Sequence, residues 1–117
     1  MEIHRFDVSS ALSISTAVIH GDVLYLSGFG PDDLSLPVRG QAMQIFAKID
    51  HHLGLHGTNK SRLLQVTAWL RDIESFKEWA AAWNDWVDAE NPPVRATVGA
   101  QLADPSMLVE VMVTAAL

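Results

Sequence analysis

The sequence contains no cysteine, so neither a disulfide framework nor thiol chemistry is available to it. Cations are also scarce: 8 Lys and Arg residues stand against 14 Asp and Glu residues, and the formal net charge is −6. These cations are scattered singly along the chain. Because proteins bind nucleic acids by neutralising phosphates with Lys and Arg, this balance disfavours a nucleic-acid partner.

Long hydrophobic runs are absent as well. No stretch approaches the roughly 20 apolar residues that span a bilayer, and the segment Met1–Arg5 lacks the apolar core of a signal peptide. We therefore expect a soluble, cytoplasmic protein without a membrane partner. The 117 residues predict one domain over 1–117. The apolar fraction of 49% is high for so small a domain, which predicts that part of the apolar surface is hidden in an oligomer.

Hydrophobic periodicity predicts eight elements. Strands are expected at 2–8, 13–20, 22–27, 63–70, 94–100 and 107–116, and helices at 38–53 and 75–89. Gly21-Asp22 is expected to form a hairpin turn, and Gly54 and Gly57 are expected to end the first helix. Gln41 is expected on the polar side of that helix, opposite the apolar stripe. The order β-β-β-α-β-α-β-β predicts an α+β domain with a mixed sheet, whose two helices cover one face and leave the other needing a partner.

Arg95 and Glu110 are the residues that we expect to carry chemistry. If the last two strands form an antiparallel hairpin centred between Leu102 and Ala103, Arg95 lies opposite Glu110 on the same face. Glu110 stands in an otherwise apolar strand, where a carboxylate needs a partner. One interpretation is a structural ion pair that fixes the strand register. The other is a site in which Arg95 holds an anionic substrate and Glu110 transfers a proton.

Several segments, in collinear order, follow one known sequence pattern: Gly21-Asp22, Leu26–Gly28, Val66–Asp72 with Phe76, Asn91–Val98, Leu108–Val111 and Ala115-Ala116. Together they resemble the reactive intermediate deaminase (Rid) family, also known as YjgF-like or L-PSP endoribonuclease-like proteins. Two further segments, Gly57–Ser61 and Trp83–Val87, are similar to a YoaB-like branch of the family. The resemblance spans almost the whole chain, so it is more specific than any single motif.

The resemblance implies a chorismate-mutase-like fold and a homotrimer with clefts between its subunits. It also implies hydrolysis of reactive 2-imino acids to 2-oxo acids and ammonia, without a metal or an organic cofactor. In such a site Arg95 binds the substrate carboxylate through its planar fork, and Glu110 activates water. Backbone groups near Gly28 and Thr97 are expected to line the cleft.

Two positions depart from the family pattern. Many deaminases of the family carry a tyrosine where this chain has Ile14, and a cysteine where it has Thr97. The loss of the tyrosine removes a hydrogen-bonding group from the cleft and is expected to alter the substrate range. Thr97 still contributes its backbone.

Other functions fit the same residues less well. A non-catalytic trimer that binds small carboxylates as a sensor or chaperone-like partner would use Arg95 but not Glu110. Endoribonuclease activity, a label that some relatives carry, is the weakest of the three because the chain is acidic. His52 and His56 have the spacing of metal ligands on a helix, but no third ligand is evident, and we expect both to be solvated. The tryptophans of the second helix are expected to be buried.

Overall fold

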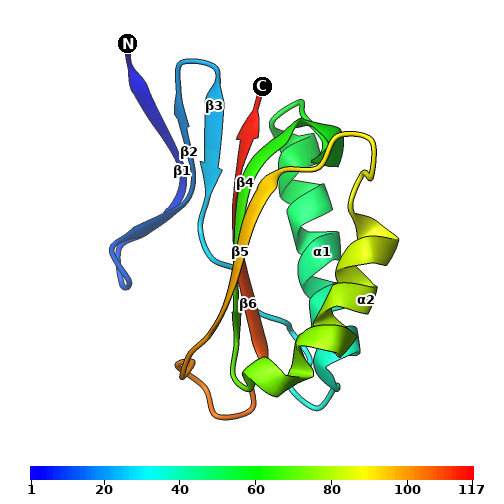
Figure 1. Ribbon diagram of the computed structural model, residues 1–117. Coiled ribbons are helices and arrows are strands. Elements are labelled where there is room, and N and C mark those ends of the chain that lie inside the picture. Colours follow the sequence, from blue (N-terminus) through cyan, green and yellow to red (C-terminus); the bar gives the residue numbers. More distant parts are fainter.

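Six strands form one mixed sheet in the computed structural model, which describes residues 1–117 (Figure 1). The strands are β1 (Ile3–Ser9), β2 (Ile14–His20), β3 (Val23–Leu26), β4 (Leu63–Leu70), β5 (Val94–Gly99) and β6 (Val109–Ala116). The helices are α1 (Val38–Leu55) and α2 (Phe76–Trp86), and short 3₁₀ turns precede β4 (Lys60–Arg62) and α2 (Ile73–Ser75). The predicted order of elements and the α+β class are therefore confirmed.

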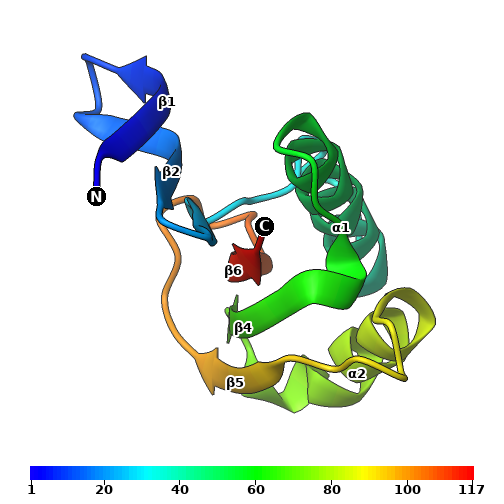
Figure 2. The same ribbon diagram turned by 90° about the horizontal axis from the view of Figure 1, so that it is seen from above.

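Both helices lie on the same side of the curved sheet, with β1 and β5 at its two edges (Figure 2). Between the layers, 21 buried apolar residues form one core cluster. The predicted stripe of α1 is buried, as are Trp79, Trp83 and Trp86 of α2. Alternate residues of β4 and β6 also point into this core, because successive side chains of a strand face opposite sides. Neither helix is long and apolar enough to cross a membrane.

The other face of the sheet is left uncovered by the chain. Ile14, Tyr25 and Met112 are between 44% and 49% exposed on it. Large apolar side chains on one contiguous face mark an interaction surface. The predicted uncovered face of the sheet is therefore confirmed, and the partner that would cover it stays a prediction.

The predicted hairpin between the last two strands is wrong. The sheet order is β1-β2-β3-β6-β4-β5, so β4 lies between β5 and β6. The reason is the crossover through α2, which returns the chain to the same sheet and lays β5 parallel to β4. The chain then passes the end of β4 through the loop at 100–108, and β6 pairs antiparallel with the other edge of β4.

The ends of the helices differ slightly from expectation. Helix α1 continues through Gly54, and Gly57 ends it with a positive φ of 76° that suits glycine. Helix α2 ends at Trp86, earlier than predicted, because Val87 is already extended. The hairpin turn at Gly21-Asp22 is confirmed, with Gly21 at a φ of 61°.

Gln41 is fully buried, so its predicted position on the polar side of the helix is wrong. Its Nε2 donates to the carbonyl oxygens of Leu36 and Ser106, both at 3.0 Å. Its Oε1 accepts from the N–H of Leu108 at 2.8 Å. One amide therefore fixes the loop before α1 to the start of β6, two residues from Glu110, and satisfies backbone groups that would otherwise be buried without partners.

Replacing Gln41 with leucine should lower the free energy of unfolding by about 3 kcal/mol, because several buried backbone groups lose their partners together. Urea denaturation at a fixed protein concentration measures the change. Gln44→Leu is the matched control. It removes a side chain that bonds the exposed N–H groups of Asp32 and Asp33, and we expect a loss of only about 1 kcal/mol. Equal losses in the two variants would contradict the role assigned to Gln41.

His52 and His56 are half-buried, so the prediction that these two histidines are solvated is wrong. The His52 ring stacks on Phe29 with centroids 4.9 Å apart, and His56 meets Phe6 edge-on at 4.7 Å. Burial lowers the pKa of His52, assisted by the neighbouring His51, while Asp7 acts in the opposite direction. The folded protein therefore disfavours the charged form of this imidazole.

Stability should fall as the pH drops below about 6.5, the ordinary pKa of histidine. Below that value the unfolded chain takes up a proton at His52 that the folded chain, with its lowered pKa, resists. Denaturation by urea at pH 7.5 and 5.5 should show the loss. In His52→Phe, which keeps an aromatic ring against Phe29, the loss should shrink. His20→Gln, at an exposed histidine, is the control and should lose as much stability at pH 5.5 as the unmodified chain. An equal loss in His52→Phe would show that His52 does not cause the pH dependence.

Candidate functional site

Glu110 lies in the middle of β6 and points to the uncovered face of the sheet. It is half-buried, and its direct neighbour on β4 is Trp69. Its carboxylate lies against Gly28: a Cβ at that position would come within 2.8 Å of Glu110 Oε2. Only glycine admits this approach without a shift of one of the two groups. Two of the predicted site residues, Glu110 and Gly28, are therefore in contact.

Backbone pairing fixes this contact. Phe29, directly after Gly28, exchanges two hydrogen bonds with Val111, directly after Glu110, at 2.8 and 3.0 Å. The bridge extends the β3–β6 pairing beyond the end of β3. Because the bridge joins the two following residues, Gly28 stays beside the carboxylate.

A shallow groove of about 440 Å³ surrounds the Glu110 carboxylate. Its lining residues are Ile14, Ser15, Val18, Tyr25, Leu26, Ser27, Gly28, Glu110 and Met112, and we call it the carboxylate groove. Three of the predicted site residues, Glu110, Gly28 and Ile14, therefore lie together. The groove contains no Lys or Arg, so Glu110 supplies its only formal charge.

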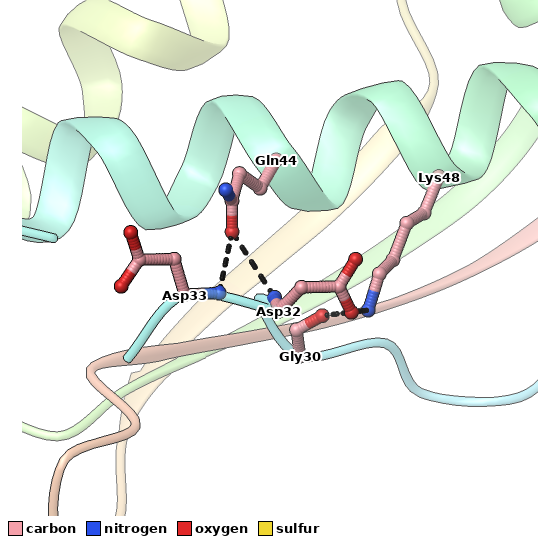
Figure 3. A network of polar contacts seen from close by, with 5 residues as sticks. All are labelled: Gly30, Asp32, Asp33, Gln44 and Lys48. Atoms are coloured by element: carbon pink, nitrogen blue, oxygen red, sulfur yellow. Dashed lines mark hydrogen bonds and ion pairs between the residues drawn. The ribbon is translucent and has the colours of Figure 1, made fainter. Parts of the chain in front are cut away.

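The loop after Gly28 is held against α1 by a polar network (Figure 3). Gln44 Oε1 accepts from the backbone N–H groups of Asp32 and Asp33 at 3.0 and 2.9 Å. Lys48 Nζ donates to the carbonyl oxygen of Gly30 at 2.8 Å and pairs with the Asp32 carboxylate at 2.6 Å. The segment that brings Gly28 to Glu110 is thus tied to a helix at one end and to β6 at the other.

Arg95 lies on β5, at the edge of the sheet, and points to the helix side. Its guanidinium carbon lies 5.2 Å from the centroid of the Trp83 ring and 5.8 Å from that of Phe76. The Arg95 guanidinium forms no ion pair and no hydrogen bond within the chain, whereas Arg39 forms an ion pair and Arg71 donates to backbone carbonyls. The aromatic rings orient the guanidinium by cation–π contact and leave its donors free.

Thr97 lies two residues further along the same strand. It is opposite Ala68 of β4, a buried residue, and so shares the helix-side face with Arg95. Its Oγ1 is buried and has no hydrogen-bond partner in the chain. The outer edge of β5 pairs with no strand of the chain, so backbone groups there are free. We call Arg95, Thr97 and this outer edge the β5 edge.

Arg95 and Glu110 point to opposite faces of the sheet. Arg95 is paired with Val66 of β4, and Glu110 with Trp69 of the same strand. Val66 and Trp69 are three residues apart on β4, so their side chains face opposite sides of the sheet. Paired residues share a face, so Arg95 and Glu110 also face opposite sides. The predicted structural ion pair is therefore wrong, because β4 separates the two residues and neither has a charged partner. The predicted site is divided between the carboxylate groove and the β5 edge.

Some residues of the site were not predicted from the sequence. Tyr25 and Met112 line the carboxylate groove because they alternate with core residues on β3 and β6. This alternation could have identified them. Arg71 was only one of several scattered cations in the sequence. In the structure it donates to the carbonyl oxygens of Leu102, Asp104 and Met107 and so holds the loop before β6 in place.

No group of three or more His, Cys, Asp or Glu side chains is arranged to hold a metal ion. His52 and His56 each pack against a phenylalanine. The chemistry that the site offers on its own residues is therefore that of one carboxylate able to accept a proton and one guanidinium able to bind an anion.

Comparison with known proteins agrees with the resemblance seen in the sequence. Residues 5–117 match the family described as Endoribonuclease L-PSP. The chain is 38% identical over 116 residues to the RutC family protein YoaB of Escherichia coli, covering 99% of both chains. It is 36% identical over 115 residues to a RutC family protein of Haemophilus ducreyi, covering 98% of this chain and 97% of that one.

The fold agrees as well. A crystal structure of a YjgF family member from Neisseria meningitidis superimposes with a TM-score of 0.93 at 33% identity, covering 99% of this chain and 95% of that one. Similarity of sequence over nearly the whole length and similarity of fold lead to the same assignment: the chain belongs to the Endoribonuclease L-PSP family, the group of the RutC and YjgF proteins.

Proposed function

We propose that the protein hydrolyses 2-imino acids to 2-oxo acids and ammonia in clefts between the subunits of a homotrimer. Each cleft combines the carboxylate groove of one subunit with the β5 edge of its neighbour. The observation that carries the proposal is that Glu110 and Arg95 are both unpaired and lie on opposite faces of one chain. A second copy can bring the two charges together where one chain cannot.

The substrate requirements follow from the two half-sites. A 2-imino acid carries a carboxylate next to an electrophilic C=N bond. The Arg95 guanidinium can bind the carboxylate through two parallel hydrogen bonds. Its contacts with the Trp83 and Phe76 rings hold it in one orientation before the substrate binds. The apolar walls of the carboxylate groove, including Ile14 and Met112, suit the substrate side chain.

The reaction needs one group that first accepts and then donates a proton. The Glu110 carboxylate takes a proton from a water molecule as its oxygen attacks C2 of the iminium, and the C=N π electrons move to nitrogen. The resulting carbinolamine carries a hydroxyl and an amine on C2. Glu110 returns the proton to nitrogen, the C–N bond breaks, and ammonia leaves as the hydroxyl oxygen forms the C=O bond. Glu110 takes the hydroxyl proton and passes it to the departing ammonia, which leaves as ammonium. The sum is iminium plus water to 2-oxo acid plus ammonium.

RNA cleavage, which the family name suggests, fits these surfaces less well. The carboxylate groove contains a carboxylate and no cation, and the chain carries a net charge of −6. Both repel a phosphate backbone, whose binding depends on Lys and Arg. We therefore propose a small carboxylate-bearing substrate in place of RNA.

Mixing two inactive variants tests the divided site. Arg95→Lys and Glu110→Gln trimers are unfolded together in equal amounts, refolded and assayed for imine hydrolysis, with the imine supplied by an amino-acid oxidase. In a ring of three, random assembly makes about three quarters of the trimers mixed, and each of these has one complete cleft, so about a quarter of the wild-type activity should return. Light scattering should give about three times 12.8 kDa for each preparation.

Each variant refolded alone serves as the control and should remain inactive. No recovery in the mixture would show that the two residues do not combine across subunits. A monomer in light scattering would contradict both the trimer and the shared cleft.

A further inference from the structure

A second hollow, of about 250 Å³, lies between the two helices, on the opposite side of the sheet from the carboxylate groove. It is lined by residues of α1 and α2 and by Lys60 of the 3₁₀ turn before β4. The core separates it from Glu110, and Arg95 does not line it. We call it the helix hollow.

The floor of the helix hollow is aromatic and apolar. The Phe46 and Trp86 rings stack with centroids 4.4 Å apart and an interplanar angle of 1°. Two small side chains, Ala47 and Ala82, leave the space open above them, and Met43, which is 56% exposed, forms part of the wall. Such a surface favours an apolar group of a ligand.

Charged side chains of both signs lie at the edge of this floor, and two of them, Lys60 and Asp50, form no ion pair. Arg39 and Asp85 pair with each other. The Lys60 ammonium forms no ion pair or hydrogen bond within the chain, and it lies 5.7 Å from the centroid of the Trp86 ring. Hydrogen bonds from Asn91 and Glu90 chiefly lower the pKa of Asp88, and the Lys60 charge adds to this effect without an ion pair. Asp50 Oδ2 accepts from the indole N–H of Trp86 at 3.0 Å, and its other oxygen has no partner in the chain. One free cation and one free carboxylate oxygen therefore flank the same indole.

We propose that the helix hollow binds a free amino acid with an apolar side chain. The amino acid's carboxylate contacts Lys60, its ammonium contacts the free oxygen of Asp50, and its side chain lies on the aromatic floor. A zwitterion matches the two free charges, whereas a simple organic anion leaves Asp50 facing a negative ligand and a simple amine leaves Lys60 facing a positive one. The small volume excludes nucleotides and larger cofactors.

Trp86 provides a direct readout, because its indole N–H is bonded to Asp50. In amide and indole NMR spectra of the whole protein, L-leucine and L-phenylalanine should shift the Trp86 indole signal with a dissociation constant in about the millimolar range. 3-Phenylpropanoate, which lacks the ammonium, and 2-phenylethylamine, which lacks the carboxylate, should each bind about tenfold more weakly than phenylalanine.

Two charge-neutralising variants locate the site. Lys60→Gln and Asp50→Asn should each weaken L-phenylalanine binding about tenfold. The asparagine still offers an oxygen to the Trp86 indole, and unchanged thermal unfolding would show that the fold is kept. Lys77→Gln, at an exposed lysine of α2 outside the helix hollow, should bind like the unmodified protein. Glu110→Gln should bind normally too, because the helix hollow is separate from the proposed active site.

The proposal is overturned if the Trp86 signal does not move up to the solubility limit of either amino acid. It is also overturned if either single-charge analogue binds as tightly as phenylalanine, since the hollow then recognises one charge and not a zwitterion. Unchanged affinity in both Lys60→Gln and Asp50→Asn would exclude the helix hollow as the binding place.

Discussion

Replacing Glu110 with glutamine is expected to slow the proposed imine hydrolysis by about 10²–10⁴-fold, the usual cost of losing a general base. The amide has nearly the same shape as the carboxylate, so it should fit against Gly28 and keep the groove intact. It cannot take a proton from water at neutral pH. Binding of pyruvate or 2-oxobutyrate should survive, because the proposed carboxylate contact belongs to Arg95.

The measurement pairs the imine assay with calorimetric titration of a 2-oxo acid. Glu90→Gln, at an exposed glutamate outside the carboxylate groove, is the matched control. It should leave the rate of imine hydrolysis and the affinity for the 2-oxo acid unchanged. Gly28→Ala adds a second comparison, since its Cβ would displace the carboxylate without removing it. Hydrolysis should fall in this variant as well, because position matters as much as basicity.

Wild-type turnover in Glu110→Gln would remove the carboxylate from the chemistry. If 2-oxo acids still bound, the non-catalytic carboxylate-binding trimer would become the better description. That alternative uses Arg95 in the same way, so Glu110 is the residue that distinguishes the two functions.

The elements were predictable because their signals are local. The stripe from Ala42 to Leu53 repeats at helical spacing, and its members are buried against the sheet. The turn at Gly21-Asp22 lies between two apolar runs and forms with a positive φ at the glycine. Residue types within one segment decide such features, so the sequence alone was sufficient.

The order of strands was not predictable in the same way. Whether β6 pairs with β5 or with β4 depends on where the α2 crossover returns the chain, and no local signal at Val94–Gly99 reports that. The assumption that consecutive strands pair gave a false Arg95–Glu110 contact. The residue types at Arg95 and Glu110 were nevertheless informative, because in the structure each side chain carries a charge and has no charged partner.

Gln41 shows a second limit. An amide in a helix looks solvent-facing by type, and its burial becomes evident only when the loop before α1 and the start of β6 are placed around it. Buried polar groups that satisfy backbone from distant segments are defined by tertiary structure. Gly28 is a similar case. A Cβ at this position would collide with the Glu110 carboxylate, which lies more than 80 residues away in the sequence.

Arg95→Lys should abolish most of the proposed deaminase activity while the proposed trimer and its melting temperature stay nearly unchanged. The substitution keeps the charge and removes the planar fork. Lysine can still lie over Trp83 and Phe76 as a cation, so the strand loses little stability. A substrate carboxylate loses one of two parallel hydrogen bonds and the orientation that they impose.

The expected loss therefore appears in both affinity and rate. A displacement of ~1 Å at the reacting carbon costs on the order of 10²-fold in rate, and binding of pyruvate or 2-oxobutyrate should weaken in calorimetry. Arg5→Lys, at an exposed arginine of β1, should behave like the unmodified protein in both measurements. Since Arg95 has no ion pair in the chain, an ion pair with Glu110 no longer explains an arginine here, and we propose that the fork held over two rings binds a ligand. Wild-type binding and turnover in Arg95→Lys would show that the planar fork is not needed, and would contradict the role proposed here for Arg95.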